Sequence, residues 1–172
     1  DNLDDLYILS NLPDDLDVHA QAFLDNPLVV VARADHPLAH QKNLPLSVLD
    51  GADFVTREMG SGTRLAVEKL LAEHDVSVQV RLELGSNEAI KQAIAGGLGI
   101  SVLSRHTLIT EPPHGELTVL DVEHFPIQRH WYVAYLAGKQ LSVIAQAFLE
   151  FMVRSSQKTL ENSGRRSLAL QP

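Results

Sequence analysis

Two strand-to-helix junctions carry residue types that could bind a small anion. Ser61, Thr63 and Arg64 follow a short apolar strand and open a helical stretch. Ser86 and Asn87 open a second helical stretch in the same way. Free backbone N–H groups at a helix start, nearby hydroxyls and a guanidinium suit a carboxylate or a phosphate. The alternative at each junction is helix capping alone, with a solvated arginine.

Two further arginines each end an apolar strand. There, Arg33 and Arg57 would point toward the rim of a ligand cleft, where a guanidinium can clamp an acidic ligand. The alternative for each is an ordinary surface salt bridge. Together with the two junctions, the candidate ligand-binding residues are Ser61, Thr63, Arg64, Ser86, Asn87, Arg33 and Arg57.

The sequence does not favour catalysis or a metal site. Cysteine is absent, which excludes thiolate chemistry and disulfides. His36 and His40 have i, i+4 spacing, but Pro37 between them disfavours a regular helix. The run Gly60-Ser61-Gly62 has neither the spacing of a nucleophile elbow nor the ending of a Walker phosphate loop. We therefore expect no catalytic residue, no metal and no cofactor.

The elements that position both junctions alternate between strand and helix. Residues 54–56, 78–84 and 99–103 are predicted strands, and residues 62–74 and 87–96 are predicted helices. This alternation predicts an α/β fold with mostly parallel sheets covered by helices. In open sheets of this kind, ligands bind outside the carboxyl ends of the strands.

The flanking segments predict further elements and a tail. Turn residues at 25–27 separate strands 18–24 and 28–32, which we expect to pair with each other. Residues 159–172 are polar and are predicted to form a disordered tail. The remaining predicted elements are strands 6–9, 117–122 and 131–136, short helices 44–49 and 104–110, and a long helix 141–157.

The charge balance argues against one class of partner. The 172 residues carry a formal net charge of −8, and Arg165-Arg166 is the nearest approach to a basic run. Such a chain repels nucleic acid. No apolar run approaches the ~18 residues that cross a bilayer. We expect no direct contact with DNA or a membrane, and the lack of cysteine fits a cytoplasmic location.

Residues 27–39, 54–64 and 86–103 form three ordered blocks. Together these blocks resemble the effector-binding (substrate-binding) domain of LysR-type transcriptional regulators. The opening Asp4-Asp5-Leu6-Tyr7-Ile8-Leu9-Ser10 most resembles the branch that controls Calvin-cycle carboxylase (RuBisCO) operons. The resemblance implies a two-lobed, periplasmic-binding-protein-like (type 2) fold. Residues 1–35 and 122–158 would form an incomplete first lobe, and residues 36–121 the second.

The resemblance also implies a function. A small anionic effector, an organic or phosphorylated acid, would bind in the cleft between the lobes and alter a regulator on promoter DNA. The helix-turn-helix domain that contacts the DNA and the start of the first lobe are absent from this chain. Relatives pair side by side, here through helix 62–74 and strand 78–84, as a homodimer or homotetramer. Two other classes stay open: an extracytoplasmic solute-binding protein of a transporter, and an enzyme of related fold.

Overall fold

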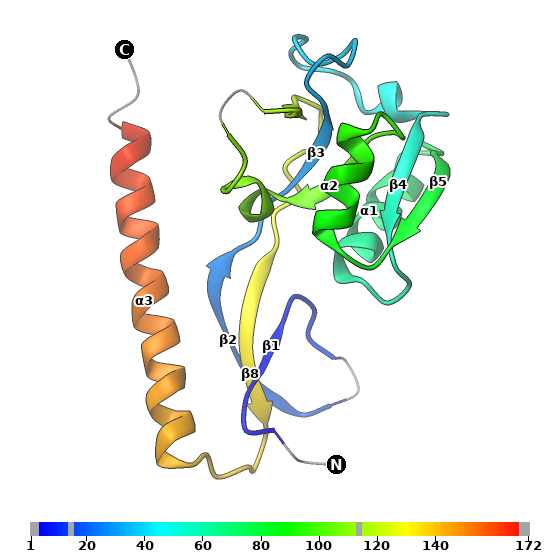
Figure 1. Ribbon diagram of the computed structural model, residues 1–172. Helices are drawn as coiled ribbons and strands as arrows, with labels where there is room; N and C mark the ends of the chain where they lie inside the picture. The colour runs from blue at the N-terminus through cyan, green and yellow to red at the C-terminus, as the bar shows by residue number, and fades with distance from the viewer. Residues whose placement is uncertain (1–3, 14–15, 113–114, 169–172) are drawn as a thin grey trace. The chain divides into compact units, whose positions relative to one another are not determined.

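The computed structural model describes residues 4–13, 16–112 and 115–168 (Figure 1). The chain divides into two compact units, each with its own sheet. Unit 1 comprises residues 1–25 and 129–172, and unit 2 comprises residues 26–128. The candidate residues all belong to unit 2, so this unit is described first.

Unit 2 is built on the central strand β3 (Leu28–Arg33). This strand lies between β6 (Ser101–Ser104) and β7 (Leu117–Leu120) and is antiparallel to both. Every β3 residue except Arg33 is buried. The unbroken apolar run of the strand follows from this burial, since both faces of the sheet are covered.

The remaining strands of unit 2 form a strand–helix–strand unit. Strand β4 (Asp53–Arg57) leads into α1 (Gly62–Glu73), and β5 (Gln79–Leu84) returns parallel to β4. A parallel bridge between Phe54 and Ile100 joins β4 to the chain entering β6. The strands of unit 2 therefore follow one another in space as β5, β4, β6, β3 and β7.

Gly99 makes the join between β4 and β6 possible. Its φ is +142°, and a Cβ atom there would lie 2.5 Å from the carbonyl oxygen of Asp53. The close approach lets the Ile100 N–H donate to that same carbonyl at 2.9 Å. Only glycine has both the backbone freedom and the small size that this position needs.

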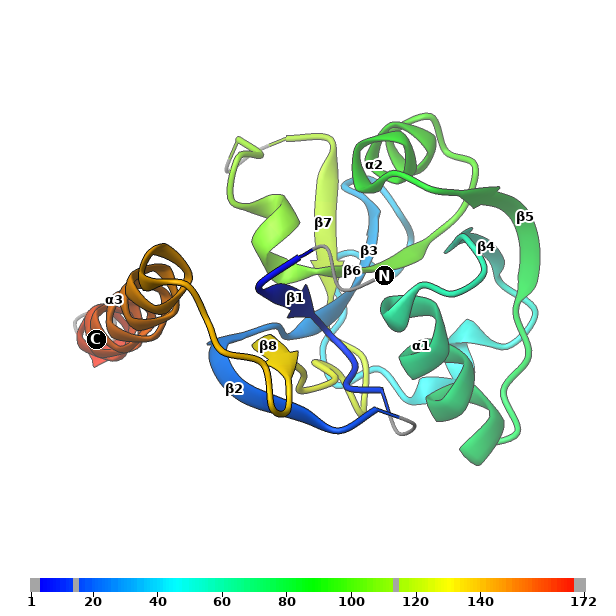
Figure 2. The same cartoon turned by 90° about the horizontal axis from the view of Figure 1, so that it is seen from below.

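Two helices cover opposite faces of the unit 2 sheet (Figure 2). On one face Val67 and Leu71 of α1 pack with Val30. On the other face Ile90 and Ile94 of α2 (Asn87–Ala95) pack with the neighbouring strand residues Val29 and Val31. Successive residues of a strand point to opposite faces of the sheet, so β3 contributes side chains to both hydrophobic clusters. Each fully buried aliphatic side chain stabilises the folded state by about 1.5–3 kcal/mol relative to an exposed one.

Unit 1 is a three-stranded antiparallel sheet with a long helix. Its strands are β1 (Tyr7–Leu9), β2 (Val18–Asp25) and β8 (His130–Leu136), with β8 in the centre. Helix α3 (Val143–Leu168) packs against β2. The pairing of β2 with β8 shifts register between Ala22 and Leu24.

The strand pairing differs from the prediction in two respects. Among the described residues most strand pairs are antiparallel, and the parallel ones are β4–β5 and the isolated bridges at Leu44–Val122 and Phe54–Ile100. The prediction that strands 18–24 and 28–32 pair with each other is wrong. Asn26-Pro27 joins two different sheets instead of forming a hairpin turn. Local turn residues do not reveal which distant strand offers a partner.

The unit boundaries also differ from the predicted lobe boundaries. The chain passes from one unit to the other at residues 25/26 and 128/129, whereas the sequence predicts these crossings at 35/36 and 121/122. The difference arises because β3 pairs with β6 and β7, which groups residues 26–35 with residues 36–121. Helix α3 continues to Leu168, into the segment 159–172 predicted as a disordered tail. Residues 159–168 contain no proline to stop a helix, and residues 169–172 lie outside the described part.

Candidate functional site

The candidate site lies at one edge of the unit 2 sheet, where two helices begin. Helix α1 follows the end of β4, and α2 follows the end of β5. The two strands are parallel, with Arg57 opposite Leu84, so loops 58–61 and 85–86 emerge side by side. Backbone N–H groups at both helix starts therefore reach the same edge, where ligands of parallel sheets bind.

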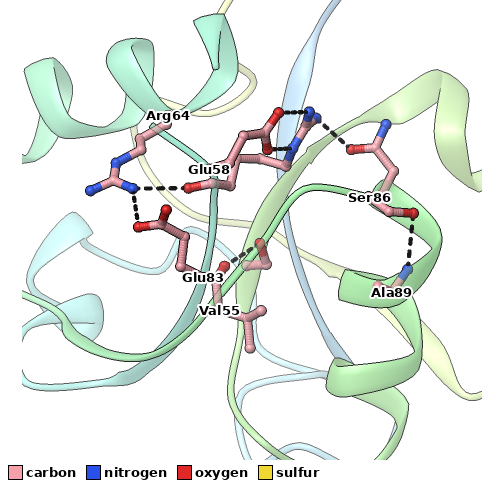
Figure 3. Close-up of polar contacts among 9 residues, drawn as sticks. Val55, Glu58, Arg64, Glu83, Ser86 and Ala89 are labelled. Carbon is pink, nitrogen blue, oxygen red and sulfur yellow. Dashed lines mark hydrogen bonds and ion pairs between the residues drawn. The ribbon is translucent and has the colours of Figure 1, made fainter. Parts of the chain in front are cut away.

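The serines at the two helix starts differ in their hydrogen bonds. The Ser86 hydroxyl accepts from the N–H of Ala89 at 3.4 Å and caps α2 (Figure 3). Ser61 is the N-cap residue of α1, but its side chain makes no capping hydrogen bond. Ser61 and Thr63 are both half-buried at this helix start. Capping therefore accounts for the Ser86 side chain and does not account for that of Ser61.

Arg57 lies between the two helix starts. Its Nη1 donates to Oδ1 of Asn87 at 2.8 Å, which ties the end of β4 to the first residue of α2. Its Nε and Nη2 donate to the two carboxylate oxygens of Glu58 at 2.7 and 2.8 Å. The fork of this guanidinium matches a bidentate anion, and in the structure that anion is the neighbouring side chain.

Arg64 is held by partners from three elements. Its Nε donates to Glu68 at 2.7 Å. Its Nη1 donates to Glu83 at 2.6 Å (Figure 3). The same Nη1 donates to the backbone carbonyl of Arg57 at 3.1 Å. The carboxylates of Glu68 and Glu83 raise the pKa of Arg64. Arg64 thus fixes α1, β5 and the end of β4 relative to one another.

Glu58 is a member of the site that the sequence analysis does not single out. Its hydrogen bonds to the Arg57 side chain, with a further one to its own backbone N–H, lower its pKa from 4.5 to about 2. The carboxylate is therefore ionised at every pH at which proteins normally function. Its position next to Arg57 in the sequence is the one signal that could have pointed to it.

Lys91 is a second charged residue that the sequence analysis does not single out. It lies on α2 and is buried, with its ammonium 2.6 Å from Glu111 and 2.7 Å from Glu88. These two carboxylates raise the pKa of Lys91. Since Glu111 follows the short helix η2 (Arg105–Leu108), the ion pair fastens α2 to that segment.

Arg33 lies at the opposite end of the sheet from the other candidates. It pairs with Asp35 and lines a cavity of about 500 Å³ with Asp53 and Gly97. Asp53 begins β4 and Arg57 ends it, about 13 Å further along the strand. The structure therefore brings Arg57, Arg64, Ser86 and Asn87 to one edge with the start of α1, and it does not bring Arg33 there.

The chemistry available at this edge is the binding of an anion. Helix N-termini, an amide and an arginine fork are all suited to oxygen atoms that carry negative charge. Over the described ranges, no three His, Cys, Asp or Glu side chains are grouped so as to hold a metal ion. No helix in the same ranges has the length and apolar character to cross a bilayer.

Comparison with known proteins gives a family match over most of the chain. The profile described as "LysR substrate binding domain" matches residues 1–157. A RuBisCO operon transcriptional regulator of Acidithiobacillus ferrooxidans is 52% identical over 155 residues, covering 90% of this chain and 50% of that protein. The HTH-type transcriptional activator CmpR of Synechocystis is 51% identical over 151 residues, covering 88% of this chain and 50% of that protein. The chain thus spans about half the length of the curated relatives it matches.

A solved structure of the same kind is closely similar. The regulatory domain of CcmR from Synechocystis PCC6803, in complex with 2-PG, superposes with a TM-score of 0.88 at 62% identity. The match covers 90% of this chain and 74% of that domain. These matches confirm the predicted two-lobed, periplasmic-binding-protein-like (type 2) fold and the resemblance to RuBisCO operon regulators.

Proposed function

The chain belongs to the LysR substrate-binding-domain family, and we propose that it is the effector-sensing part of a transcriptional regulator. The observation that carries this proposal is the 62% identity to a regulatory domain solved with 2-PG. Named relatives that are about half identical are regulators of RuBisCO operons or HTH-type activators. The relatives are transcriptional regulators, and we infer that this chain likewise senses a metabolite without converting it.

The proposed ligand is a small anionic metabolite of the class of 2-phosphoglycolate, with a phosphate and a carboxylate. We propose that one acidic group binds Arg57 and the start of α2, with Asn87 and Ser86 beside it. Ser61 and Thr63 at the start of α1 would contact the ligand from the neighbouring loop. Arg64 would act by fixing these elements, since its guanidinium already binds Glu68 and Glu83.

The rest of the regulator follows from this proposal. DNA contact would come from a helix-turn-helix segment outside these 172 residues, because a net charge of −8 repels DNA. Self-association would use α1 and β5, where Leu65, Val80 and Leu82 are exposed apolar side chains. We propose a homodimer or homotetramer in the cytoplasm, with binding of the effector shifting the population of regulator conformations.

Two alternatives receive less support. A solute-binding protein of a transporter has the same fold, but the relatives reported above are regulators. An enzyme would need a nucleophile with a base, or a pair of carboxylates, and both arginines of the site neutralise the carboxylates nearest to them. The regulator is therefore the function we propose.

Calorimetric titration of the full chain with 2-phosphoglycolate tests the proposal. We expect the wild type to bind. Arg57→Ala should bind roughly 10- to 150-fold more weakly, which is the range for the loss of one hydrogen bond to a charged group. Arg33→Ala is the matched control, because Arg33 lies at the other end of the sheet. Equal affinity in the wild type and Arg57→Ala would place the ligand elsewhere. A panel of other phosphorylated and carboxylic acids extends the search if 2-phosphoglycolate does not bind.

A further inference from the structure

The anion-binding fork of the site is engaged by the chain itself. Both oxygens of the Glu58 carboxylate accept hydrogen bonds from Arg57, at 2.7 and 2.8 Å. The geometry is that of a bidentate arginine–carboxylate pair, which is among the stronger polar contacts in proteins. An anionic effector that binds Arg57 must therefore compete with the Glu58 carboxylate, which is itself an anion.

The Glu58 carboxylate also lies where an anion is favoured for a second reason. Its carboxyl carbon is 4.0 Å from the position that a Cβ atom on Gly85 would take. Gly85 immediately precedes Ser86, the N-cap of α2. The carboxylate is thus close to the positive end of the α2 dipole, as a bound carboxylate or phosphate would be.

The pair can open without disturbing the core. Arg57 and Glu58 are neighbours in the sequence, and 40% of the Glu58 side chain is exposed. The loop that follows contains the exposed Met59 and Gly60, whose φ is +85° and whose Cβ position has no neighbour within 4 Å. Glu58 belongs to neither buried cluster of unit 2, so its rotation into water breaks the ion pair to Arg57 and leaves both clusters in place.

Arg64 provides the contrast. Its two carboxylate partners come from α1 and β5, and only 17% of its side chain is exposed. Displacing Glu83 would loosen the contact between α1 and β5, whereas Glu68 is an i, i+4 partner within α1. Of the two arginines at this edge, Arg57 alone is paired with a loop carboxylate that can turn away.

We propose that Glu58 is a built-in competitor, which an anionic effector displaces from Arg57 in order to bind. The inference rests on the proposed function, because it concerns the same site. It also narrows the ligand class. A phosphate monoester carries about −1.5 to −2 charges at neutral pH, against −1 for a carboxylate, so the exchange favours a phosphorylated acid.

The test is calorimetry of the full chain with two probes, 2-phosphoglycolate and malonate, in which a second carboxylate replaces the phosphate. The variant Glu58→Gln keeps the size of the side chain and removes its charge. We expect it to bind 2-phosphoglycolate about three- to tenfold more tightly than the wild type, since a charge-assisted hydrogen bond is roughly twice as strong as a neutral one. Displacement of Glu58 costs the same for both probes, so malonate should gain affinity by a similar factor.

The control is Glu73→Gln, which removes the same charge at the other end of α1. It separates competition at Arg57 from a change in net charge, and its affinity should match that of the wild type. A thermal melt checks that Glu58→Gln folds. If it does not, the side-chain NMR signal of Arg57 in the wild type decides, because displacement of Glu58 by 2-phosphoglycolate must shift it.

Several results would overturn the inference. Unchanged or weaker binding of 2-phosphoglycolate by Glu58→Gln, while the wild type binds, would refute the competitor and leave the proposed function intact. An unshifted Arg57 signal at saturation would do the same. A gain for 2-phosphoglycolate that malonate does not share would also refute the competitor, because both probes must displace the same carboxylate. Absence of binding to any acid in all variants would refute the proposed function, and the inference with it.

Discussion

Replacing Gly99 by alanine should lower the stability of unit 2, because the substitution disturbs the join between β4 and β6. The loss should exceed that caused by either of the two glycine substitutions described below. A Cβ atom at this position would lie 2.5 Å from the carbonyl oxygen and 2.8 Å from the carbonyl carbon of Asp53. Both are backbone atoms, so one of the two strands must move. The φ of +142° adds strain for any residue with a side chain.

The magnitude follows from these two terms. Backbone strain of this kind costs about 1–3 kcal/mol, and forcing an extra carbon into a filled space costs about 1–3 kcal/mol. The expected loss of unfolding free energy is therefore about 2–6 kcal/mol, a large part of the stability of an ordinary domain. With an m-value of about 2 kcal/mol/M, the urea midpoint should fall by about 1–3 M.

Urea unfolding followed by circular dichroism measures this loss, and two glycines serve as controls. Gly60 also has a positive φ, +85°, but no atom lies within 4 Å of its Cβ position, so Gly60→Ala isolates the strain. Gly85 has neither a positive φ nor a close contact, so Gly85→Ala should leave the midpoint almost unchanged. A midpoint for Gly99→Ala equal to that of Gly60→Ala would refute the steric argument.

Three further predictions concern the join between β4 and β6, the pH response of the site, and assembly. Ser101→Ala removes a buried hydrogen bond of 2.6 Å to a β4 carbonyl and should cost about 1 kcal/mol in urea unfolding. Arg57 lowers the pKa of Glu58 to about 2, so this pair stabilises the fold above the ordinary pKa of 4.5 and is lost as the pH falls toward 2. Glu58→Gln should therefore lose less stability than the wild type between pH 5 and pH 2.5, the range set by those two values; an equal loss would show that the pair does not contribute. Val80→Glu should weaken self-association in sedimentation experiments, whereas Ile109→Glu, at a more exposed apolar side chain, should not; equal behaviour of the two would remove β5 from the interface.

The sequence predicts the elements around the site well, because their signals are local. Alternating apolar residues mark β5, and helical spacing with a serine cap marks α2. The direction of strand pairing is not local. Strand β3 is antiparallel to β6, which continues from a parallel bridge to β4, and no short-range pattern records this.

The direction in which the strands pair also explains which candidate residues come together. Arg33 and Arg57 each end an apolar strand, and a parallel sheet would place them at one edge. Because β3 runs opposite to β4, their ends lie at opposite edges. The helix starts at Ser61 and Ser86 meet because β4 and β5 are indeed parallel.

The partners of the arginines lie beyond the reach of sequence patterns. Arg64 binds Glu83, which is 19 residues away, and Arg57 binds Asn87, which is 30 residues away. Side chains of this length adopt many rotamers, and the fold selects one of them. A sequence thus indicates that a guanidinium is present at the edge, but the fold decides whether it faces a ligand or a carboxylate of the chain.

A crystal structure of the full chain with 2-phosphoglycolate is the most direct test of the account. We expect the phosphate or the carboxylate within hydrogen-bond distance of the Arg57 guanidinium and of the first N–H groups of α2, with Glu58 turned toward water. A complex in which the ligand lies away from this edge, and in which the Arg57–Glu58 pair is intact, would contradict the account.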